Sequence, residues 1–365
     1  MKNIFLFGYY GFENAGDEGI LQGIVEQITK KVPGVKLTAL SYNAKDTSDK
    51  YNINTVSRNN FKEVIKAIKE SDVVVSGGGS ILQDVTSSRS LLYYLGIIAL
   101  AKKMGKKVMF YGNGFGPITK GFNKKLVKHI INQIDVITLR DHESKEAMQS
   151  LGIKKDIIVT ADIALGLEPI KDEEIKEIFQ KEDIDTTKKW VGISVREWKG
   201  YKEYKEIIAK TADYLVDRNY EILFIPMQYP NDVNTSMEIA NMMENTPKIL
   251  NKKYSPRELI GIIGKIDLLL GMRLHSLIFA TIVETPMVGL EYDTKIKNFL
   301  KIVEQKSGGK VEDLDIIHLW STIDSVLQHE KDYIKKLQKT RIGLLQKIEM
   351  NVEIFERFIK EGDKK

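Results

Sequence analysis

Short apolar runs alternate with amphipathic stretches from the first residues of the chain onward. The apolar runs at residues 2–8, 35–41 and 72–80 (KNIFLFG, VKLTALS and DVVVSGGGS) have the length and continuous hydrophobicity of buried strands. Between them, residues 18–32 (EGILQGIVEQITKKV) and 61–71 (FKEVIKAIKES) repeat apolar side chains at helical spacing. Strands that alternate with helices in this way are typical of a doubly wound α/β domain with a mainly parallel sheet.

This alternation stops once and then restarts, which divides the chain. Residues 168–189 (EPIKDEEIKEIFQKEDIDTTKK) are acidic and polar and indicate a linker with a short helix, and residues 190–198 (WVGISVREW) begin a new strand. We therefore predict an α/β fold with two doubly wound parallel-sheet domains that face a cleft. The predicted parts are an N-terminal α/β domain at 1–168, a C-terminal α/β domain at 169–325 and a C-terminal helix at 326–365.

Composition narrows the class of protein. The chain has 365 residues, of which 42% are hydrophobic and 29% charged, as expected for a folded protein. It has no cysteine, which excludes disulfides, thiolate zinc sites and cysteine nucleophiles. No apolar run approaches the roughly 20 residues of a membrane span, and the first apolar stretch is too short for a signal peptide. We expect a cytoplasmic protein that rests peripherally on the inner face of the membrane.

Charge and motif content limit the partners. The formal net charge of +5 weakly favours anionic partners, but no nucleic-acid-binding motif is present, so we expect no nucleic acid partner. His, Asp and Glu residues do not cluster at metal-ligand spacing, so we expect no metal. Residues 8–19 (GYYGFENAGDEG) lack the Gly-Lys-Ser/Thr ending of a P-loop and match the dinucleotide fingerprint poorly, so we expect no nicotinamide or flavin cofactor.

Polar residues and glycines follow the predicted strands, where ligands bind in such sheets. In the N-terminal domain these residues are Asp17, Gly77, Gly78, Gly79, Ser80, Asp84 and Arg140. In the C-terminal domain they are Arg196, Gln228, Arg273, His275 and Lys295. The glycines at 77–79 allow the backbone to approach a ligand closely, and they equally suit a tight turn packed against its neighbour.

Six segments occur in an order that resembles the polysaccharide pyruvyltransferase family, and most of all its CsaB members from bacterial cell-wall biosynthesis. They are 8–19, 77–84 (GGGSILQD), 112–117 (GNGFGP), 139–141 (LRD), 271–280 (GMRLHSLIFA) and 289–296 (GLEYDTKI). The resemblance implies a GT-B-like fold and transfer of a pyruvyl group from phosphoenolpyruvate onto two sugar hydroxyls. The product is then a cyclic ketal, phosphate is released, and phosphoenolpyruvate is a co-substrate without any further cofactor.

The CsaB-like members imply an acceptor and a purpose. The acceptor would be N-acetylmannosamine in a lipid-diphosphate-linked disaccharide, bound on the N-terminal domain, with phosphoenolpyruvate on the C-terminal domain. The ketal would belong to a secondary cell-wall polymer that anchors surface-layer proteins.

Phosphoenolpyruvate carries a carboxylate and a phosphate, so its pocket requires several cations. We assign catalytic roles to His275, Asp84 and Arg140, with His275 passing a proton to the leaving phosphate. The substrate-binding residues are predicted to be Arg273, Lys295, Arg196, Gly77, Gly78, Gly79, Ser80 and Asp17. Arg140 could instead form a plain ion pair with Asp141, Arg273 could hold its own loop, and Lys295 could be a solvated lysine.

Ketal formation also needs an acid for the methylene carbon and a base for the hydroxyls. Asp84, Asp17 and Glu18 are the acidic side chains at this edge of the first domain, and the sequence leaves the choice among them open. The main alternative function is a GT-B glycosyltransferase or a sugar-nucleotide epimerase. A non-catalytic glycan-binding module is disfavoured, because neutral glycans would call for aromatic platforms in place of clustered cations.

The end of the chain predicts an amphipathic helix. Its apolar stripe is Ile334, Leu337, Leu345, Ile348, Val352, Phe355 and Ile359. Residues 330–365 contain ten Lys or Arg and seven Asp or Glu residues. We expect the stripe to pack on the first domain and the basic face to make weak contact with an anionic membrane surface.

Overall fold

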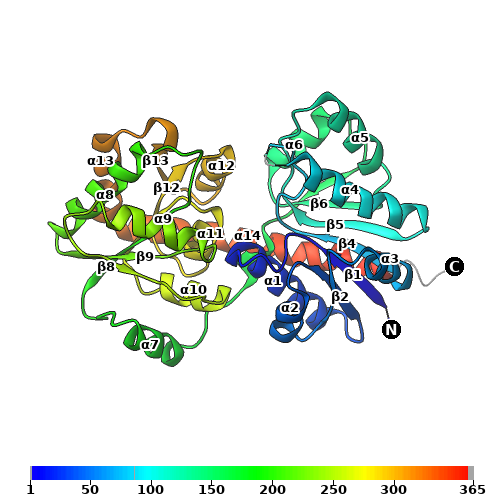
Figure 1. The fold of residues 1–365 in the computed structure, drawn as a ribbon, viewed down its shortest axis with the longest axis horizontal. Coiled ribbons are helices and arrows are strands. Elements are labelled where there is room, and N and C mark those ends of the chain that lie inside the picture. The colour runs from blue at the N-terminus through cyan, green and yellow to red at the C-terminus, as the bar shows by residue number, and fades with distance from the viewer. Residues whose placement is uncertain (1, 86, 361–365) are drawn as a thin grey trace. The chain divides into compact units, whose positions relative to one another are not determined.

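The computed structural model describes residues 2–85 and 87–360, which form two compact units of parallel α/β structure (Figure 1). Unit 1 contains residues 2–13, residues 17–166 and the chain from Leu344 onward, and unit 2 contains Asn14–Gly16 and Leu167–Gly343. The expected class of two doubly wound parallel-sheet domains is confirmed. The chain passes from unit 1 into unit 2 between residues 166 and 167, two residues before the boundary predicted after residue 168.

Unit 1 is built on a seven-stranded sheet in the order β3-β2-β1-β4-β5-β6-β7, and every neighbouring pair is parallel. The strand order runs outward in one direction from β1 and in the other from β4. The switch point of the sheet therefore lies between the carboxyl ends of β1 and β4. The strands are β1 (Asn3–Phe7), β2 (Lys36–Ser41), β3 (Asn54–Ser57), β4 (Val73–Gly77), β5 (Lys107–Asn113), β6 (Val136–Leu139) and β7 (Ile157–Val159).

Helices cover both faces of this sheet, which explains why its central strands are continuously apolar. All five residues of β4 (VVVSG) are buried. The helical segments are α1 (Ala15–Lys31), α2 (Ala44–Tyr51), α3 (Phe61–Glu70), α4 (Ser88–Lys103), α5 (Gly121–Ile131), α6 (His142–Ser150) and the 3-10 turn η1 (Ile163–Gly166).

Unit 2 repeats the architecture with a six-stranded parallel sheet in the order β10-β9-β8-β11-β12-β13. Its switch point lies between β8 and β11. The strands are β8 (Lys189–Ser194), β9 (Tyr220–Phe224), β10 (Lys248–Ile249), β11 (Leu268–Gly271), β12 (Met287–Glu291) and β13 (Lys306–Lys310). The helical segments are α7 (Asp172–Lys181), α8 (Glu203–Val216), α9 (Asn231–Ala240), α10 (Pro256–Ile263), α11 (Leu274–Ile282), α12 (Thr294–Ile302), η2 (Val311–Asp313) and α13 (Ile316–Gln328).

The terminal helix α14 (Glu330–Lys360), red in Figure 1, is shared between the two units, which divide it between Gly343 and Leu344. Its buried apolar residues are Tyr333, Leu337, Leu344, Ile348, Val352, Phe355, Phe358 and Ile359. The prediction of Leu345 in this stripe was wrong: Leu345 is 36% exposed and Leu344 takes the inward position. Seven residues, or two helical turns, separate Leu337 from Leu344, whereas a step of eight drifts off the face.

Two features are absent from the described residues. None of the helices there is both long and apolar enough to cross a membrane. The same residues contain no group of three or more His, Asp or Glu side chains that could hold a metal ion. Membrane contact through the basic face of α14 stays a prediction, and residues 361–365 of that segment lie outside the described residues.

Candidate active site

Two arginines follow the strands that flank the switch point of unit 2. β8 and β11 pair in register, with Ser194 opposite Gly271 at their carboxyl ends. Arg196 and Arg273 each stand two residues beyond these ends, at equivalent positions of neighbouring strands. The parallel register therefore brings two guanidinium groups to the edge of the sheet where α/β proteins bind their ligands.

Arg273 is fixed by an acidic partner. Its Nε donates to Asp232 Oδ2 at 2.9 Å, and its Nη2 donates to Asp232 Oδ1 and, at 3.0 Å, to Gln228 Oε1. Asp232 is only 1% exposed and also accepts hydrogen bonds from the backbone amides of Met227 and Gln228. The guanidinium is thus held rigidly, while its Nη1 group has no hydrogen-bond partner among the described residues. It can donate to a ligand.

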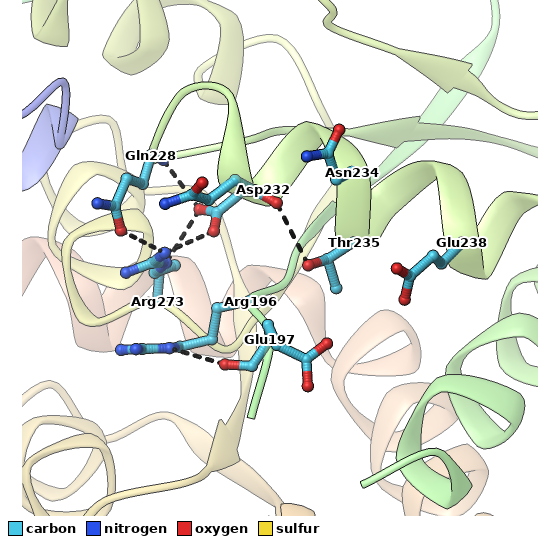
Figure 2. Close-up of a pocket in the computed structure, with 9 residues that line it drawn as sticks. Arg196, Glu197, Gln228, Asp232, Asn234, Thr235, Glu238 and Arg273 are labelled. Atoms are coloured by element: carbon cyan, nitrogen blue, oxygen red, sulfur yellow. Dashed lines mark hydrogen bonds and ion pairs between the residues drawn. The ribbon is translucent and has the colours of Figure 1, made fainter. Parts of the chain in front are cut away.

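A cavity of about 350 Å³ lies beside this pair. Figure 2 shows Arg273 pointing toward Asp232 and Gln228, with Arg196 nearby and the side chains of α9 along another wall. The lining residues are Arg196, Glu197, Gln228, Asn231, Asp232, Asn234, Thr235, Glu238 and Arg273. A cavity of this size, in which charged and amide groups converge, suits a small polar ligand.

Tyr292 follows β12 and is not among the residues that line the cavity, but its ring contacts Arg196, which is. The guanidinium of Arg196 lies 4.8 Å from the centroid of the Tyr292 ring, and Lys295 Nζ lies 5.1 Å from it. Burial by itself would raise the pKa of the Tyr292 hydroxyl. The positive charges of Lys295, Arg196 and Arg273, with a hydrogen bond from Lys295, outweigh burial and lower that pKa instead. Three cations therefore act on one point of unit 2.

The cations differ in how far protein carboxylates already neutralise them. Lys295 Nζ is 3.5 Å from Asp293 Oδ2 in a partly exposed pair. Arg196 forms no ion pair within the described residues; its Nε contacts the Glu197 carbonyl oxygen at 3.4 Å. Arg196 is the cation of this cavity that is best able to compensate the charge of an incoming anion.

The opposite side of the cavity is acidic but compensated. Glu197 and Glu238 both accept hydrogen bonds from Lys205, whose side chain is 7% exposed. Lys205 of α8 thus joins Glu197, after β8, to Glu238 of α9. Burial by itself would raise the pKa of Glu197, but the hydrogen bond and the charge of Lys205 outweigh burial and lower it.

His275 is the second residue of α11 and packs against Gly16, in the short segment Asn14–Gly16 of unit 2. A Cβ atom added to Gly16 would stand 2.1 Å from His275 Nδ1, so only glycine leaves room for the imidazole ring. The Nε2 atom is buried. His275 is not among the residues that line the cavity of Figure 2.

Arg140 follows β6 in unit 1 and is held by two carboxylates. Its Nη1 lies 2.9 Å from Asp162 Oδ2, its Nε lies 3.3 Å from Asp141 Oδ2, and its Nη2 donates to Ser80 Oγ at 3.2 Å. Burial by itself would lower the pKa of Arg140, but the two carboxylates outweigh burial and raise the pKa. The plain ion pair with Asp141 is therefore present, and Asp162 is a second partner. The structure brings Arg140 and Ser80 together.

Asp84 is placed where proton delivery is unfavourable. It is 3% exposed, and its carboxylate accepts hydrogen bonds from the amide and hydroxyl of Thr119, the amide of Lys120 and the side chain of Asn123. Burial by itself would raise the pKa of this carboxyl group, but these four hydrogen bonds outweigh it and hold the pKa well below its usual range. A general acid needs the opposite shift, so the geometry favours a loop-anchoring role.

The three glycines after β4 are explained by the protein's own packing. A Cβ on Gly77 would lie 2.2 Å from the Tyr10 hydroxyl, and one on Gly78 would lie 2.4 Å from Ile20. Gly78 and Gly79 have φ of 64° and 66°, in the left-handed region. Both features fit the tight-turn interpretation. Substrate contact by this turn stays a prediction, and Asp17 lies beside it, 3.1 Å from the position of a Cβ on Gly79.

Glu18, the other acid in this segment, is engaged in the fold. It is 5% exposed, Oε1 accepts from the amide of Gly11 at 2.8 Å, and Oε2 accepts from the Tyr51 hydroxyl at 2.7 Å.

Three functional residues were missed in the sequence. Asp232 and Asp162 are the buried partners of the two arginines, and Tyr292 is the ring on which three cations act. Asp162 and Tyr292 follow strands, so the rule that pointed to Arg273 and Lys295 covers them as well. Asp232 is the second residue of helix α9, so that rule does not reach it.

The two units define a GT-B-like protein. HepE of Anabaena in complex with UDP-glucose superimposes with a TM-score of 0.67 at 11% identity, over 99% of this chain and 100% of that one. The UDP-GlcNAc 2-epimerase of Neisseria meningitidis bound to UDP-GlcNAc gives a TM-score of 0.66 at 15% identity, over 98% of this chain and 100% of that one. At these identities the likeness concerns the fold alone.

The sequence comparison places the chain within that class. Residues 14–294 match the polysaccharide pyruvyl transferase family, and the chain belongs to it. A curated relative, the amylovoran biosynthesis protein AmsJ of Erwinia amylovora, is 23% identical over 252 residues. That alignment covers 64% of this chain and 60% of AmsJ, so the match spans less than two thirds of the relative's length.

Proposed function

We propose that this chain transfers a pyruvyl group from phosphoenolpyruvate onto two hydroxyls of a saccharide. The observation that carries the proposal is a cavity of about 350 Å³ lined by Arg196 and Arg273, with Lys295 and Arg196 both over the ring of Tyr292. Membership of the polysaccharide pyruvyl transferase family supports the reaction class. Phosphoenolpyruvate is small and multiply charged, which matches a small cavity bordered by several cations.

In this proposal the two arginines divide the donor between them. Arg273 is held by Asp232 and presents Nη1 in a fixed direction, which suits a planar carboxylate. Arg196, which forms no ion pair with any residue the structure describes, takes the phosphate oxygens together with Lys295. Tyr292 positions both cations through its ring.

The chemistry requires two new C–O bonds and the loss of one. A proton adds to the methylene carbon of phosphoenolpyruvate, which becomes a methyl group, and the first hydroxyl attacks the adjacent carbon and loses its proton. The bond from that carbon to the phosphate oxygen then breaks, and the second hydroxyl closes the ketal and loses its proton. The net products are the ketal and inorganic phosphate. His275 serves the leaving phosphate, and Asp17, beside the turn after β4, is the candidate acid or base of unit 1.

The resemblance to CsaB members supports N-acetylmannosamine in a lipid-diphosphate-linked disaccharide as acceptor, in a cell-wall pathway that serves surface-layer anchoring. A lipid-linked acceptor of this kind is located at the inner face of the membrane. The same proposal therefore places this chain in the cytoplasm, at the membrane periphery.

The test is incubation of the full chain with phosphoenolpyruvate and a panel of N-acetylmannosamine-containing acceptors. We expect acceptor-dependent release of inorganic phosphate and a product whose mass has gained one pyruvyl ketal. Phosphate release without acceptor, or an unmodified acceptor after complete consumption of the donor, would contradict the proposal.

The alternative, a glycosyltransferase or sugar-nucleotide epimerase, is favoured only by the GT-B-like fold and by nucleotide ligands in structures that resemble it. A thermal-shift comparison separates the two. Phosphoenolpyruvate should raise the melting temperature and UDP-sugars should not; the reverse pattern would favour the alternative.

A further inference from the structure

Three aromatic rings form a stack at the carboxyl ends of β1 and β2 in unit 1. Tyr9 and Phe12 follow β1, and their ring centroids are 4.0 Å apart with planes inclined by 9°. Phe12 in turn stacks on Tyr42, which follows β2, at 4.7 Å and 20°. Tyr42 is the last ring of the stack and is 55% exposed, so one of its faces meets Phe12 and the other meets solvent.

The loop that carries the first two rings is rigid. Tyr10 points inward, is 1% exposed and donates to the carbonyl oxygen of Gly77. Gly11 has φ of 78°, and a Cβ there would lie 2.2 Å from Ser41 Oγ, so only glycine fits. The backbone of Tyr42 then donates to the Tyr10 carbonyl at 3.0 Å. These contacts preorganise the stack without help from a ligand.

A cation borders the stack. The guanidinium of Arg58, which follows β3, lies 5.1 Å from the centroid of Phe12 and 4.8 Å from that of Tyr93. The Tyr93 hydroxyl donates to the Arg58 carbonyl at 3.0 Å and fixes the loop. Arg58 is half-buried and forms no ion pair within the described part of the chain. Because β3, β2 and β1 are neighbours in the sheet, the three strands present this row along one edge.

We propose that this row, defined as Tyr9, Phe12, Tyr42 and Arg58, is a docking platform for the acceptor saccharide. A pyranose ring lies on the exposed face of Tyr42, because the apolar C–H face of a sugar packs well on an aromatic ring. An anionic group of the same saccharide, such as its diphosphate, pairs with Arg58. The inference rests on the proposed function for the identity of the ligand. It gives a role to Tyr9 and Phe12 of the motif segment 8–19, and it adds Tyr42 and Arg58, which neither the motifs nor the donor site include.

The surroundings favour a saccharide over a lipid surface. An anionic membrane attracts clustered basic residues. The adjacent helix α2 (AKDTSDKY) instead carries two lysines and two aspartates, and Lys50 is paired with Asp46 at 2.6 Å. Exposed aromatic rings next to a mixed, balanced set of charges suit a ligand that is apolar on one face and polar at its rim.

Direct binding tests the platform without turnover. The probes are an N-acetylmannosamine-containing disaccharide diphosphate with a short alkyl chain, and the same disaccharide without its diphosphate. Both are titrated calorimetrically into the full chain. Tyr42→Ala should weaken both by about tenfold, and Tyr42→Trp should restore binding. Arg58→Ala should weaken only the diphosphate probe, by about tenfold. The matched control is Phe122→Ala, which removes a 72% exposed ring elsewhere in unit 1 and should bind both probes like the wild type.

The outcomes separate the platform from the catalytic proposal. In one outcome the wild type binds the probes but releases no phosphate from phosphoenolpyruvate, and Tyr42→Ala abolishes binding. This outcome overturns the proposed function and supports the platform. Turnover with an unchanged KM for acceptor in Tyr42→Ala overturns the platform and supports the function. Absence of binding by the wild type, or a Tyr42→Ala defect confined to sedimentation with anionic lipid vesicles, also overturns the platform.

Discussion

The two arginines of unit 2 have the same position relative to their strands but different charge environments. Arg273 is compensated by the buried Asp232, whereas Arg196 has only aromatic rings and a carbonyl oxygen near its guanidinium. Removing a cation that has no protein partner should cost ligand affinity alone. Removing one that compensates a buried carboxylate should cost the fold as well.

Arg196→Ala should therefore raise the KM for phosphoenolpyruvate by ten- to a hundredfold, as expected for a charge-assisted contact of about 1.5–3 kcal/mol, and leave the free energy of unfolding unchanged. Arg273→Ala should also lower the free energy of unfolding, by about 3–5 kcal/mol. Steady-state kinetics and urea denaturation measure the two effects. The control Lys297→Ala removes an exposed lysine of α12 and should change neither the KM nor the free energy of unfolding. A wild-type KM in Arg196→Ala would contradict the role of Arg196 in binding the donor.

Asp84 offers a pH test. The pKa of Asp84 is lower in the folded protein than in the unfolded chain, where it is about 4. The ionised carboxylate therefore stabilises the fold at pH values above the unfolded-state pKa. This contribution is lost as the pH falls toward and through the folded-state pKa. Asp84→Asn should lower the free energy of unfolding by about 2 kcal/mol near neutral pH. The deficit should shrink below about pH 4. Chemical denaturation across pH measures it, with the exposed Asp49→Asn as control. A deficit independent of pH would refute the ionic origin.

For single residues, the sequence indicated where a side chain lies relative to its strand but not which side chains it contacts. Arg196, Arg273 and Arg140 were found because strand ends can be located from apolar runs. The role of Asp84 depends on a loop that returns 35–39 residues later to donate four hydrogen bonds. No local pattern encodes such a return.

Among the elements, the contribution of α14 to stability can be tested by one substitution. Phe355 is fully buried, and its ring meets that of Tyr111 in β5 edge-on at 5.6 Å. Phe355→Ala should lower the free energy of unfolding by about 3–5 kcal/mol. Ile342→Ala, at a 62% exposed position of the same helix, should change it by less than about 0.5 kcal/mol. Equal stabilities in urea would show that the end of α14 does not support unit 1.

Element prediction succeeded where apolar residues set the pattern and failed where they did not. β4 and β11 are continuous apolar runs and were found from the sequence. β13 (KSGGK) has no apolar side chain, and its strand geometry comes from pairing with β12 at the edge of the sheet. Because tertiary pairing makes that strand, no propensity could indicate it.

For the whole molecule, the exposed charge of α14 supports a test of membrane contact. Residues 330–360 carry eight basic and five acidic side chains, while the apolar face is buried and unavailable for insertion. We expect the full chain to sediment with anionic vesicles at low salt and to be released at high salt, because each basic residue near such a surface contributes about 1 kcal/mol that salt screens. Neutral vesicles are the control. Equal binding to both, or none at low salt, would remove the membrane from the proposal.

The division of α14 between the units also fixes the order in which the molecule can be completed during synthesis. Unit 1 needs the segment that begins at Leu344, but the ribosome must first produce residues 167–343 of unit 2. At about 5–20 residues per second, that delay is roughly 10 to 35 s. Throughout it, the nascent first sheet lacks the partner that will cover Tyr111, so its apolar surface is open to water and to chaperones. Unit 1, whose synthesis begins first, is therefore the last of the two units to be completed.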